Sequence, residues 1–428
     1  MSDVEWINAA LIAARPQAIG ALLRYFRDLD AAEEAFQDAC LRALKSWPRN
    51  GPPRDPTAWL ILVGRNAALD QVRRQRKQQP LPAEEQISEL EDTETALAER
   101  LDESRYRDDV LRLLFICCHP DLPATQQIAL ALRIVCGLSV KQIARAFLVS
   151  EAAMEQRITR GKGRVAQAQV PFEAPGAAER AARLAAVAAM IYLLFNEGYS
   201  TAQAAGDSRA SLCDEAIRLA RLLLRLFPAE PEVMGLTALL LLQHARAAAR
   251  FDAHGALVLL EEQDRDRWDG PLIAEGLALV EKAMRHARPG PYQLQAAIAA
   301  LHSSARRPDD TDWAQIDLLY AALEQVQPSP VVTLNRAVAV SKVRGAEQAL
   351  AMIEPLEARL AGYFYFFGVK GALLLQLGRE EAARTAFGRA VALANTAAEA
   401  AHIRAHLDRL SQGAALEPRS PNEPSVSA

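Results

Sequence analysis

The stretch that most constrains the fold is Gly137–Arg164, which has the pattern of two short helices joined by a tight turn. Its first half carries apolar residues at i, i+3, i+4 and i+7, namely Val140, Ile143, Ala144 and Phe147. The pair Leu148-Val149 then interrupts the helix, and Ser150 is a good N-cap for a second one. The pattern therefore predicts a helical pair with a sharp connection.

The second helix of this pair has an apolar side and a cationic side. Met154 and Ile158 are spaced to point back to the first helix, and the cations that follow are Arg157, Arg160, Lys162 and Arg164. One helix that braces on the backbone and a second that enters the major groove make up a helix-turn-helix. The pattern indicates binding to duplex DNA; the alternative is an ordinary helical hairpin.

Composition predicts an all-α protein with no overall charge that favours nucleic acid. The 428 residues suggest two to four domains, and half of them are hydrophobic, enough for sizeable cores. Alanine, leucine and arginine dominate while aromatics are few, which favours packed helices over sheets. The net charge of −4 gives no global nucleic-acid signature, so DNA binding has to come from local basic patches.

The cysteines and apolar runs predict a cytoplasmic protein without a metal or other cofactor. The five cysteines form no C-x-x-C pair and fit a reducing compartment. Cys117-Cys118-His119 are adjacent and cannot all converge on one ion. No leader sequence follows Met1–Trp6, and the longest apolar run, Leu184–Phe195, is too short to cross a bilayer. No nucleophile and base are suitably spaced, so we do not expect an enzyme.

The chain divides by composition into consecutive blocks. We expect a helical domain, an acidic linker, the helix-turn-helix domain, a long helical extension and a disordered Pro/Ser tail, over residues 1–79, 80–109, 110–169, 170–416 and 417–428.

The long extension is repetitive. Gly371, Leu374, Ala383 and Phe387 align with the residues 34 positions earlier, Ala337, Val340, Ala349 and Ile353. Small residues fall on small ones and bulky residues on bulky ones. A 34-residue period of paired helices is the tetratricopeptide signature, and we expect three to five helical pairs.

A second segment suited to nucleic acid lies upstream, at Trp59–Lys77. Leu60, Val63 and Ala67 give this helix an apolar face, and the opposite face and the C-terminal end are rich in Arg and Asn. Such side chains read base edges and phosphates, although cations at a helix C-terminus also favour the macrodipole. We expect Trp59 to offer a flat surface for an unpaired base, beside a shaped loop at Ser46–Thr57.

The segment Asp28–Leu44 predicts another amphipathic helix. Its expected buried residues are Ala32, Ala35, Phe36, Ala39 and Leu41. The polar residues between them form either a solvated face or a docking surface for a large protein partner.

These segments together resemble a bacterial sigma factor of the extracytoplasmic-function type. The sequence AAEEAFQDACLRA resembles that family's helix for docking on core RNA polymerase, Trp59–Lys77 its helix for the −10 promoter element, and Gly137–Arg164 its module for the −35 element. The extension, with NEGY at Asn196–Tyr199 and RWDGPLIAEGLAL at Arg267–Leu279, resembles one sigma group that carries a tetratricopeptide-bearing extension.

The resemblance implies a role for individual residues. Core polymerase would be bound by Glu33, Glu34, Gln37, Asp38 and Arg42. The −10 element would be contacted by Trp59, Arg65, Asn66, Asp70, Arg73, Arg74 and Lys77. The −35 element would be contacted by Ser150, Glu151, Ala153, Gln156, Arg157, Arg160 and Lys162. The extension would contact the sigma domains, gate their access to polymerase or promoter, and offer its repeats to a protein or small ligand.

Two residues depart from the family's pattern. Leu148 stands where the turn usually has glycine, and Glu155 stands where a basic or small polar residue is common. The other function that fits these motifs is a repeat-containing regulator that binds duplex DNA without polymerase, which would leave the segment Asp28–Lys77 unexplained. A scaffold with an incidental helix-turn-helix is a third reading.

Overall fold

The computed structural model confirms the predicted all-α fold. Within the residues that it describes, every regular element is a helix and no strand occurs. The described residues are 3–51, 53–76, 103–119, 121–147, 149–167, 177–201, 207–252, 258–394, 400–401, 403–404, 407–408 and 410. The predicted tail lies outside this set, and of the predicted acidic linker only residues 103–109 are described, as part of a helix.

The chain forms two compact units, Met1–Phe227 and Pro228–Ala428, which are described separately. The boundary between them falls inside the segment predicted as one long extension, at residues 170–416. The first helices of that extension therefore belong to the same compact unit as the predicted DNA-handling helices.

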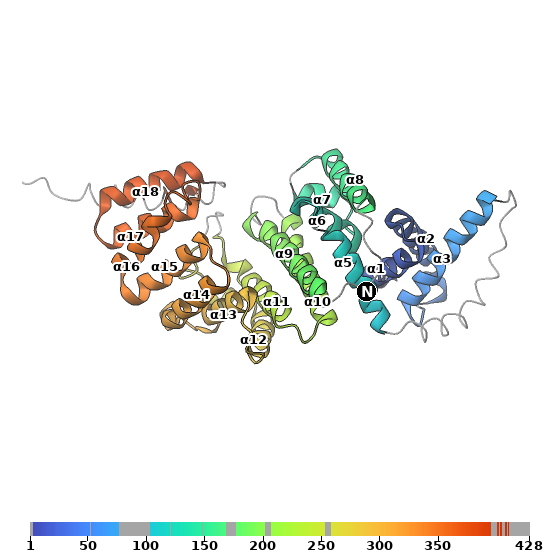
Figure 1. The fold of residues 1–428 in the computed structure, drawn as a ribbon, viewed down its shortest axis with the longest axis horizontal. Coiled ribbons are helices and arrows are strands. Elements are labelled where there is room, and N and C mark those ends of the chain that lie inside the picture. Colours follow the sequence, from blue (N-terminus) through green and yellow to red (C-terminus); the bar gives the residue numbers. More distant parts are fainter. Residues whose placement is uncertain are drawn as a thin grey trace, which may run out of the picture. The chain divides into compact units, whose positions relative to one another are not determined.

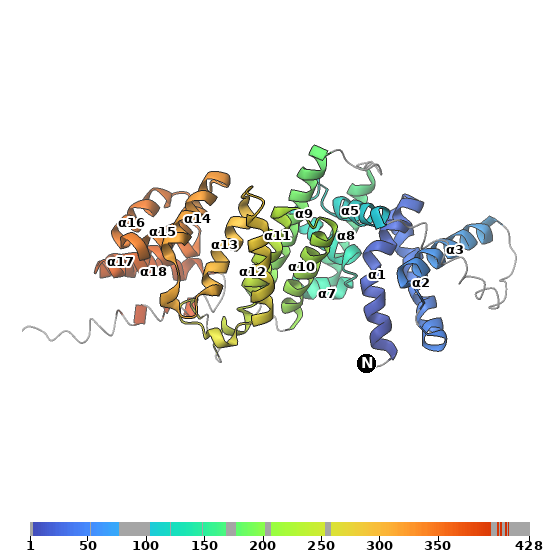
Figure 2. The ribbon, with the colours of Figure 1, turned by 90° about the horizontal axis from the view of Figure 1, so that it is seen from below.

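The first unit opens with three packed helices, α1 (Asp3–Phe26), α2 (Leu29–Asn50) and α3 (Pro56–Arg76) (Figures 1 and 2). The carboxylate of Asp28 accepts a hydrogen bond from the Ala31 N–H and caps α2, as residues of this type do at an N-cap. Asp55 accepts hydrogen bonds from the N–H groups of Thr57 and Ala58 at the start of α3. Local capping chemistry thus sets where these helices begin.

Two expectations about α2 are wrong. The predicted loop at Ser46–Thr57 is much shorter, because α2 runs on to Asn50 with Pro48 inside it. Trp47 is buried, and its ring stacks on Trp6 at 5.9 Å between centroids, which draws the last turn of α2 into the core. Leu41, expected in the core, is 58% exposed because it lies off the buried stripe of α2.

The next part of the first unit is α5 (Glu103–Cys117), α6 (Ala124–Leu130), the π-helical turn η2 (Ala131–Val135), α7 (Val140–Ala146) and α8 (Glu151–Gln167). α6 continues into η2, where the Cys136 N–H bonds the Ala131 carbonyl five residues back. α7 and α8 form the predicted helix-turn-helix.

α5 packs along α1, so the two groups of helices are joined (Figure 1). The approach is closest at Gly20, where an added Cβ would lie 2.8 Å from the Asp109 carbonyl oxygen. The buried Asp109 carboxylate pairs with Arg112 at 3.0 Å and reaches Arg24 of α1 at 3.4 Å.

The first unit ends with the helical pair α9 (Ala177–Thr201) and α10 (Asp207–Leu226), which contacts α5, α6 and α7. The segment Ala181–Tyr199 of α9 has a mean hydropathy of 1.2, enough by length and composition to cross a membrane. Core helices pass the same test, and the α9 residues Val187, Ile191 and Leu194 are fully buried. α9 is therefore explained as a core helix of this unit.

The second unit is a succession of helices in which each packs on the next. The longer ones are α11 (Pro231–His244), α12 (Gly270–Met284), α13 (Pro291–Ser304), α14 (Trp313–Val326), α15 (Pro330–Arg344), α16 (Ala346–Ile353), α17 (Phe364–Gln376) and α18 (Glu380–Leu393). Short 3₁₀ turns lie between them at η3 (Ala247–Ala249), η4 (Arg265–Arg267), η5 (Pro308–Asp310) and η6 (Glu354–Leu356).

The 34-residue register coincides with the pairs α15–α16 and α17–α18. All eight aligned residues, from Ala337 to Phe387, are buried. At Gly371 an added Cβ would lie 2.5 Å from the Phe387 ring, so the small residue is what lets α17 and α18 approach. The residues that the register aligned are therefore buried in both helical pairs.

Replacing Gly20 with alanine should separate α1 from α5. We expect Gly20→Ala to lower the free energy of unfolding of the first unit by about 1–2 kcal/mol, because the new methyl group meets a backbone carbonyl that cannot move aside. Gly163→Ala is the matched control: that position in α8 is open, and alanine there should stabilise its helix by up to about 1 kcal/mol. Urea unfolding followed by circular dichroism measures both, and equal effects would contradict the close approach.

Candidate nucleic-acid and polymerase interface

The helix-turn-helix has the apolar interior that its sequence predicts. Met154 and Ile158 of α8 are 0% and 5% exposed, and α8 contacts α7, whose Ile143 and Ala144 are also buried. The Ser150 hydroxyl accepts a hydrogen bond from the Ala153 N–H at 3.2 Å, which confirms Ser150 as the N-cap. Leu148, which departs from the family pattern, lies outside the described residues.

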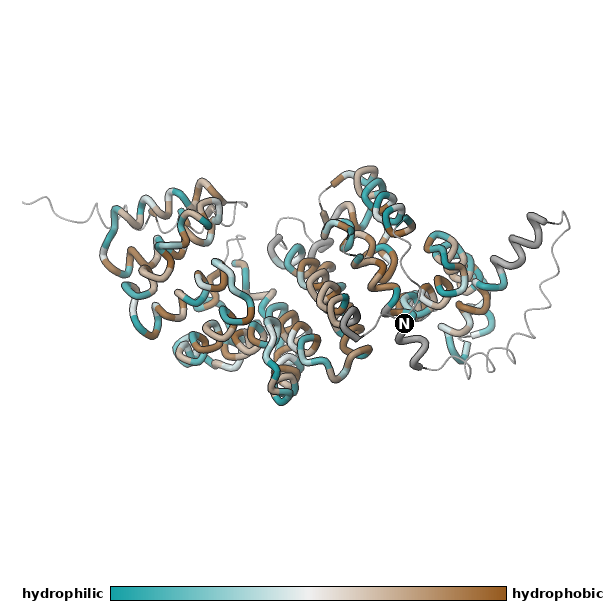
Figure 3. Tube along the Cα trace, in the orientation of Figure 1, coloured by the Kyte–Doolittle hydropathy of each residue, from teal (hydrophilic) through white to brown (hydrophobic). Residues whose placement is uncertain are grey.

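The opposite side of α8 is exposed and polar (Figure 3). The exposed residues predicted to contact DNA are Ser150, Glu151, Ala153, Gln156 and Arg160. Arg157 is half-buried, and Glu155 is exposed on the same helix. Most of the residues assigned to the −35 element therefore share one accessible face.

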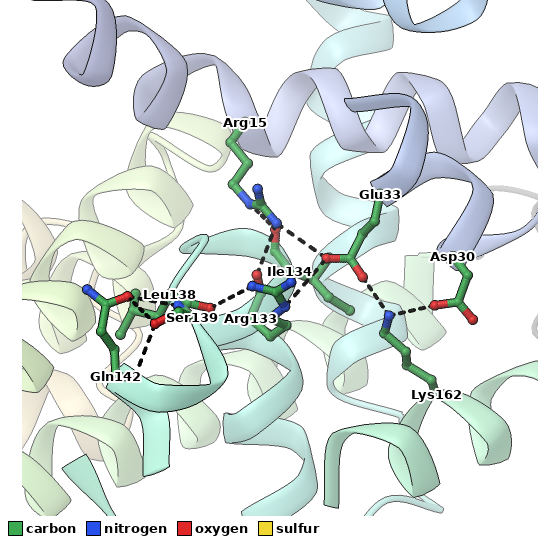
Figure 4. A network of polar contacts seen from close by, with 9 residues as sticks. All are labelled: Arg15, Asp30, Glu33, Arg133, Ile134, Leu138, Ser139, Gln142 and Lys162. Atoms are coloured by element: carbon green, nitrogen blue, oxygen red, sulfur yellow. Dashed lines mark hydrogen bonds and ion pairs between the residues drawn. The ribbon is translucent and has the colours of Figure 1, made fainter. Parts of the chain in front are cut away.

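Lys162 differs from the rest of that set because it is already engaged. Its ammonium donates to Asp30 Oδ1 at 2.6 Å and to Glu33 Oε2 at 2.6 Å, both on α2 (Figure 4). Burial alone would lower the pKa of Lys162, but the hydrogen bonds that it donates to the two carboxylates outweigh burial and hold that pKa above its usual value. Lys162 stays charged in this contact.

Glu33 is the centre of a network between α1, α2, η2 and α8 (Figure 4). Arg15 Nη2 lies 3.3 Å from Glu33 Oε1, and Arg133 Nε lies 3.9 Å from the same oxygen. Arg15 also donates to the carbonyls of Ile134 at 2.9 Å and of Arg133 at 3.1 Å. A side chain that is only 6% exposed is thus surrounded by cations from elements far apart in the sequence.

The predicted polymerase-docking residues do not form one exposed face. Glu34, Gln37 and Arg42 are exposed and Asp38 is half-buried, but Glu33 is turned inward. In this conformation the Glu33 carboxylate cannot be offered to a protein partner, because Arg15 and Lys162 already hold it.

Trp59 is not the exposed stacking surface that the sequence suggested. It is 8% exposed, and its ring meets Trp47 edge-on at 5.3 Å between centroids. Of the other residues assigned to the −10 element, Arg65 is exposed and Asn66 half-buried. The side chains of Asp70, Arg73 and Arg74 lie outside the described set, and so does the whole of Lys77.

Tyr25 is an accessible aromatic that sequence reasoning missed. It is 48% exposed at the end of α1, and the Arg65 guanidinium of α3 lies 5.3 Å from its ring centroid. The signal in the sequence is an aromatic pair flanked by arginines, Arg24-Tyr25-Phe26-Arg27.

The first helices of the extension, α9 and α10, pack against the module that contains the helix-turn-helix. α10 contacts α7, and Arg183 of α9 lies over the Phe115 ring of α5 at 5.7 Å. Glu215 and Arg218 of α10, paired at 2.8 Å, interact with the Cys136 thiol that follows η2. Burial, with the Glu215 carboxylate adding to it, raises the pKa of Cys136 well above its ordinary value.

An exposed reading helix in a helix-turn-helix, joined to a second helical group with a basic helix, defines a DNA-directed transcription factor. The sequence matches the model for sigma-70 region 2 over residues 11–78, and the model for sigma-70 region 4 over residues 112–165. The chain belongs to the sigma-70 family of transcription factors. Members of that family initiate transcription and are not enzymes.

Other comparisons describe the extension and the chain as a whole. Residues 183–284 match a family of unknown function, DUF6596, whose match begins in α9 and ends in α12. The chain is 70% identical over 410 residues to an uncharacterized protein of Rhizobium meliloti (strain 1021), covering 96% of this chain and 97% of that protein. No solved structure matches the chain.

The two sides of α8 should respond differently to substitution. Ile158→Ala should lower the free energy of unfolding by about 2–5 kcal/mol, because it leaves a cavity between α8 and α7. Arg160→Ala should change it by no more than about 0.5 kcal/mol, because the side chain is exposed. Denaturant unfolding of the two variants measures the difference. A large loss of unfolding free energy in Arg160→Ala would mean that the Arg160 side chain stabilises the fold and is not free to contact DNA.

Proposed function

We propose that this protein binds core RNA polymerase in the cytoplasm and directs it to promoters, as an extracytoplasmic-function sigma factor with a regulatory extension. The observation that carries the proposal is the exposed polar face of α8, opposite the buried Met154 and Ile158. A helix held this way can enter the major groove while its partner helix braces on the backbone.

The side chains on that face suit direct reading of base edges at the −35 element. Arginine pairs in a bidentate manner with guanine, and glutamine does so with adenine, so Arg160 and Gln156 can discriminate bases. Glu155 can accept a hydrogen bond from a cytosine amine on the same surface. A helix N-terminus favours a phosphate, so Ser150 and the first N–H groups of α8 are the proposed contact to the DNA backbone.

The α1–α3 bundle contributes the proposed surfaces for core polymerase and for the −10 element. Glu34, Gln37, Asp38 and Arg42 of α2 are the residues assigned to core polymerase that solvent reaches in this conformation. Tyr25, beside Arg65, takes the role expected of Trp59 as a surface for an unstacked base of the −10 element, since base–aromatic stacking needs an open ring face.

The extension is proposed to regulate the factor through the helix-turn-helix. Its helices α9 and α10 contact α5, α6 and α7, so a change in the extension is transmitted directly to the reading module. The later pairs, α15–α16 and α17–α18, follow the 34-residue register of tetratricopeptide repeats, which bind partners along their stacked surface. A protein or small ligand of the repeats is the proposed signal.

Removing one base-reading side chain should impair promoter use. Arg160→Ala should lower promoter-dependent run-off transcription with core polymerase by about 10- to 100-fold, the value of a lost bidentate contact. Core affinity should stay unchanged, and Arg306→Ala, an exposed arginine of the second unit, is the matched control.

The outcome of the same assay separates this function from its alternative. No stimulation of core by the wild-type chain, together with tight and specific binding of the chain alone to intact duplex, would favour a regulator that acts without polymerase.

Removing α9 and α10 should expose the Cys136 thiol. In a fragment of residues 1–227 we expect Cys136 to react slowly with a thiol reagent at pH 8, since burial raises its pKa and little thiolate forms. In a fragment of residues 1–167, which lacks α9 and α10, the pKa should fall toward about 8.5 and the reaction should accelerate at least about tenfold. Mass spectrometry identifies the labelled cysteine, and equal protection in both fragments would contradict the support that α10 gives to the helix-turn-helix.

A further inference from the structure

The connection between α11 and α12 is long for a helical array. It covers residues 245–269, whereas helix–helix connections usually take about two to eight residues. Its two ends meet, because the Asp269 N–H donates to the Ala245 carbonyl at 2.9 Å. We call residues 258–268 of this connection the strap, because they reach helices other than the pair that the connection joins.

The inner end of the strap is bound to α13. Arg265 Nη1 donates to the carbonyls of His302 and Ala305, each at 2.6 Å, at the C-terminal end of that helix. A cation suits this place, because a helix C-terminus carries partial negative charge and carbonyls without a partner in the helix. The Arg265 guanidinium also lies 4.6 Å from the ring centroid of Trp268, which is only 8% exposed. The inner end is therefore a firm attachment.

The outer end of the strap is an exposed ion pair with α15. Glu261 Oε1 lies 2.9 Å from Lys342 Nζ, although the two residues are 81 positions apart. Their side chains are 48% and 36% exposed, and an exposed pair of this kind is weak and screened by salt. Lys342 also lies 5.7 Å from the Trp313 ring of α14, a contact that does not involve the strap. The outer end is therefore released more easily than the inner one.

The strap connects helices that the stacking of pairs leaves apart. In an array of helical pairs, each pair contacts only its neighbours. The helices of the second unit follow this rule, since α11 and α12 pack on α13, and α14 packs on α15. The strap leaves the first pair, α11–α12, crosses the end of α13 and reaches α15 of the third pair. It adds a direct link between pairs that are not adjacent.

We propose that the strap is a releasable brace, which makes the first three helical pairs of the second unit move together while Glu261 holds Lys342. α15 belongs to the pairs that follow the tetratricopeptide register, and α11 is the first helix of the second unit. A change at α15, where the proposed function places a partner, is therefore carried to α11 without passing through α14. The partner rests on the proposed function, but the coupling does not.

The test compares amide hydrogen exchange in α13 and α15 of the full chain by mass spectrometry. Glu261→Gln and Lys342→Gln each remove the outer contact of the strap, and Arg265→Met removes the inner one. Glu262→Gln is the matched control, because Glu262 is the exposed neighbour of Glu261 and makes no ion pair within the part of the chain that the structure describes. Circular dichroism verifies that each variant keeps its helices.

We expect Glu261→Gln and Lys342→Gln to accelerate exchange in the last turn of α15 about two- to fivefold, and Glu262→Gln to leave it unchanged. Sodium chloride at about 0.5 M should act on the wild type as Glu261→Gln does, because salt screens an exposed pair. Arg265→Met should accelerate exchange at the end of α13 about 10- to 100-fold, since its charge-assisted hydrogen bonds are lost, and should also accelerate exchange in α15.

The combined variant decides which route carries the change to α15. Glu261→Gln together with Arg265→Met should affect α15 no more than Arg265→Met alone, because both act through one strap. Effects on α15 that add in the combined variant overturn the brace, since α13 and not the strap would then transmit the change. Unchanged exchange in α15 of both Glu261→Gln and Lys342→Gln overturns it too. Neither outcome involves polymerase or promoter DNA, so both are distinct from a failure of the proposed function.

Discussion

The arrangement of the first unit depends on how the Glu33 carboxylate is neutralised. A charged group that is 6% exposed is tolerated only when it is paired and hydrogen-bonded, since burial of an unpaired carboxylate costs several kcal/mol. Its partners come from α1, η2 and α8, so this single requirement aligns α2 with α8. The same pairing determines which charged residues of both modules remain accessible.

The helix-turn-helix is held by helices on more than one side. α5 packs on α1, with close approach at Gly20, and α9 and α10 contact the module from the extension. A DNA-reading module supported in this way cannot change its orientation without disturbing α10 or the α1–α5 packing. α9 and α10 therefore contact α6 and α7, which pack on the reading helix, and this explains why the compact unit ends at Phe227 and not near residue 170, where the sequence predicted the extension to begin.

Local patterns were sufficient to predict the parts of the site that depend on local chemistry. Helical periodicity located Met154 and Ile158 on the buried side of α8, and the N-cap preference of serine located its start at Ser150. Likewise the 34-residue register located the buried residues of two helical pairs, among them Gly371 and Phe387. In each case the partner of a residue lies within one helical pair.

The errors arose where a partner lies far along the chain. Trp59 is buried because Trp47 covers it, and Trp47 in turn stacks on Trp6 and carries α2 past the predicted loop. Glu33 and Lys162 face each other across elements that no sequence pattern brings together. A polar residue on an amphipathic helix can equally be solvated, bind a partner or pair internally, and only the tertiary packing decides among these.

The most direct test of the account is footprinting of a cognate promoter with the full chain, core polymerase, or both. The account predicts protection of the −10 and −35 elements only when both proteins are present, because core supplies the second binding surface. Protection of the −35 region by the chain alone, unchanged when core is added, would contradict it.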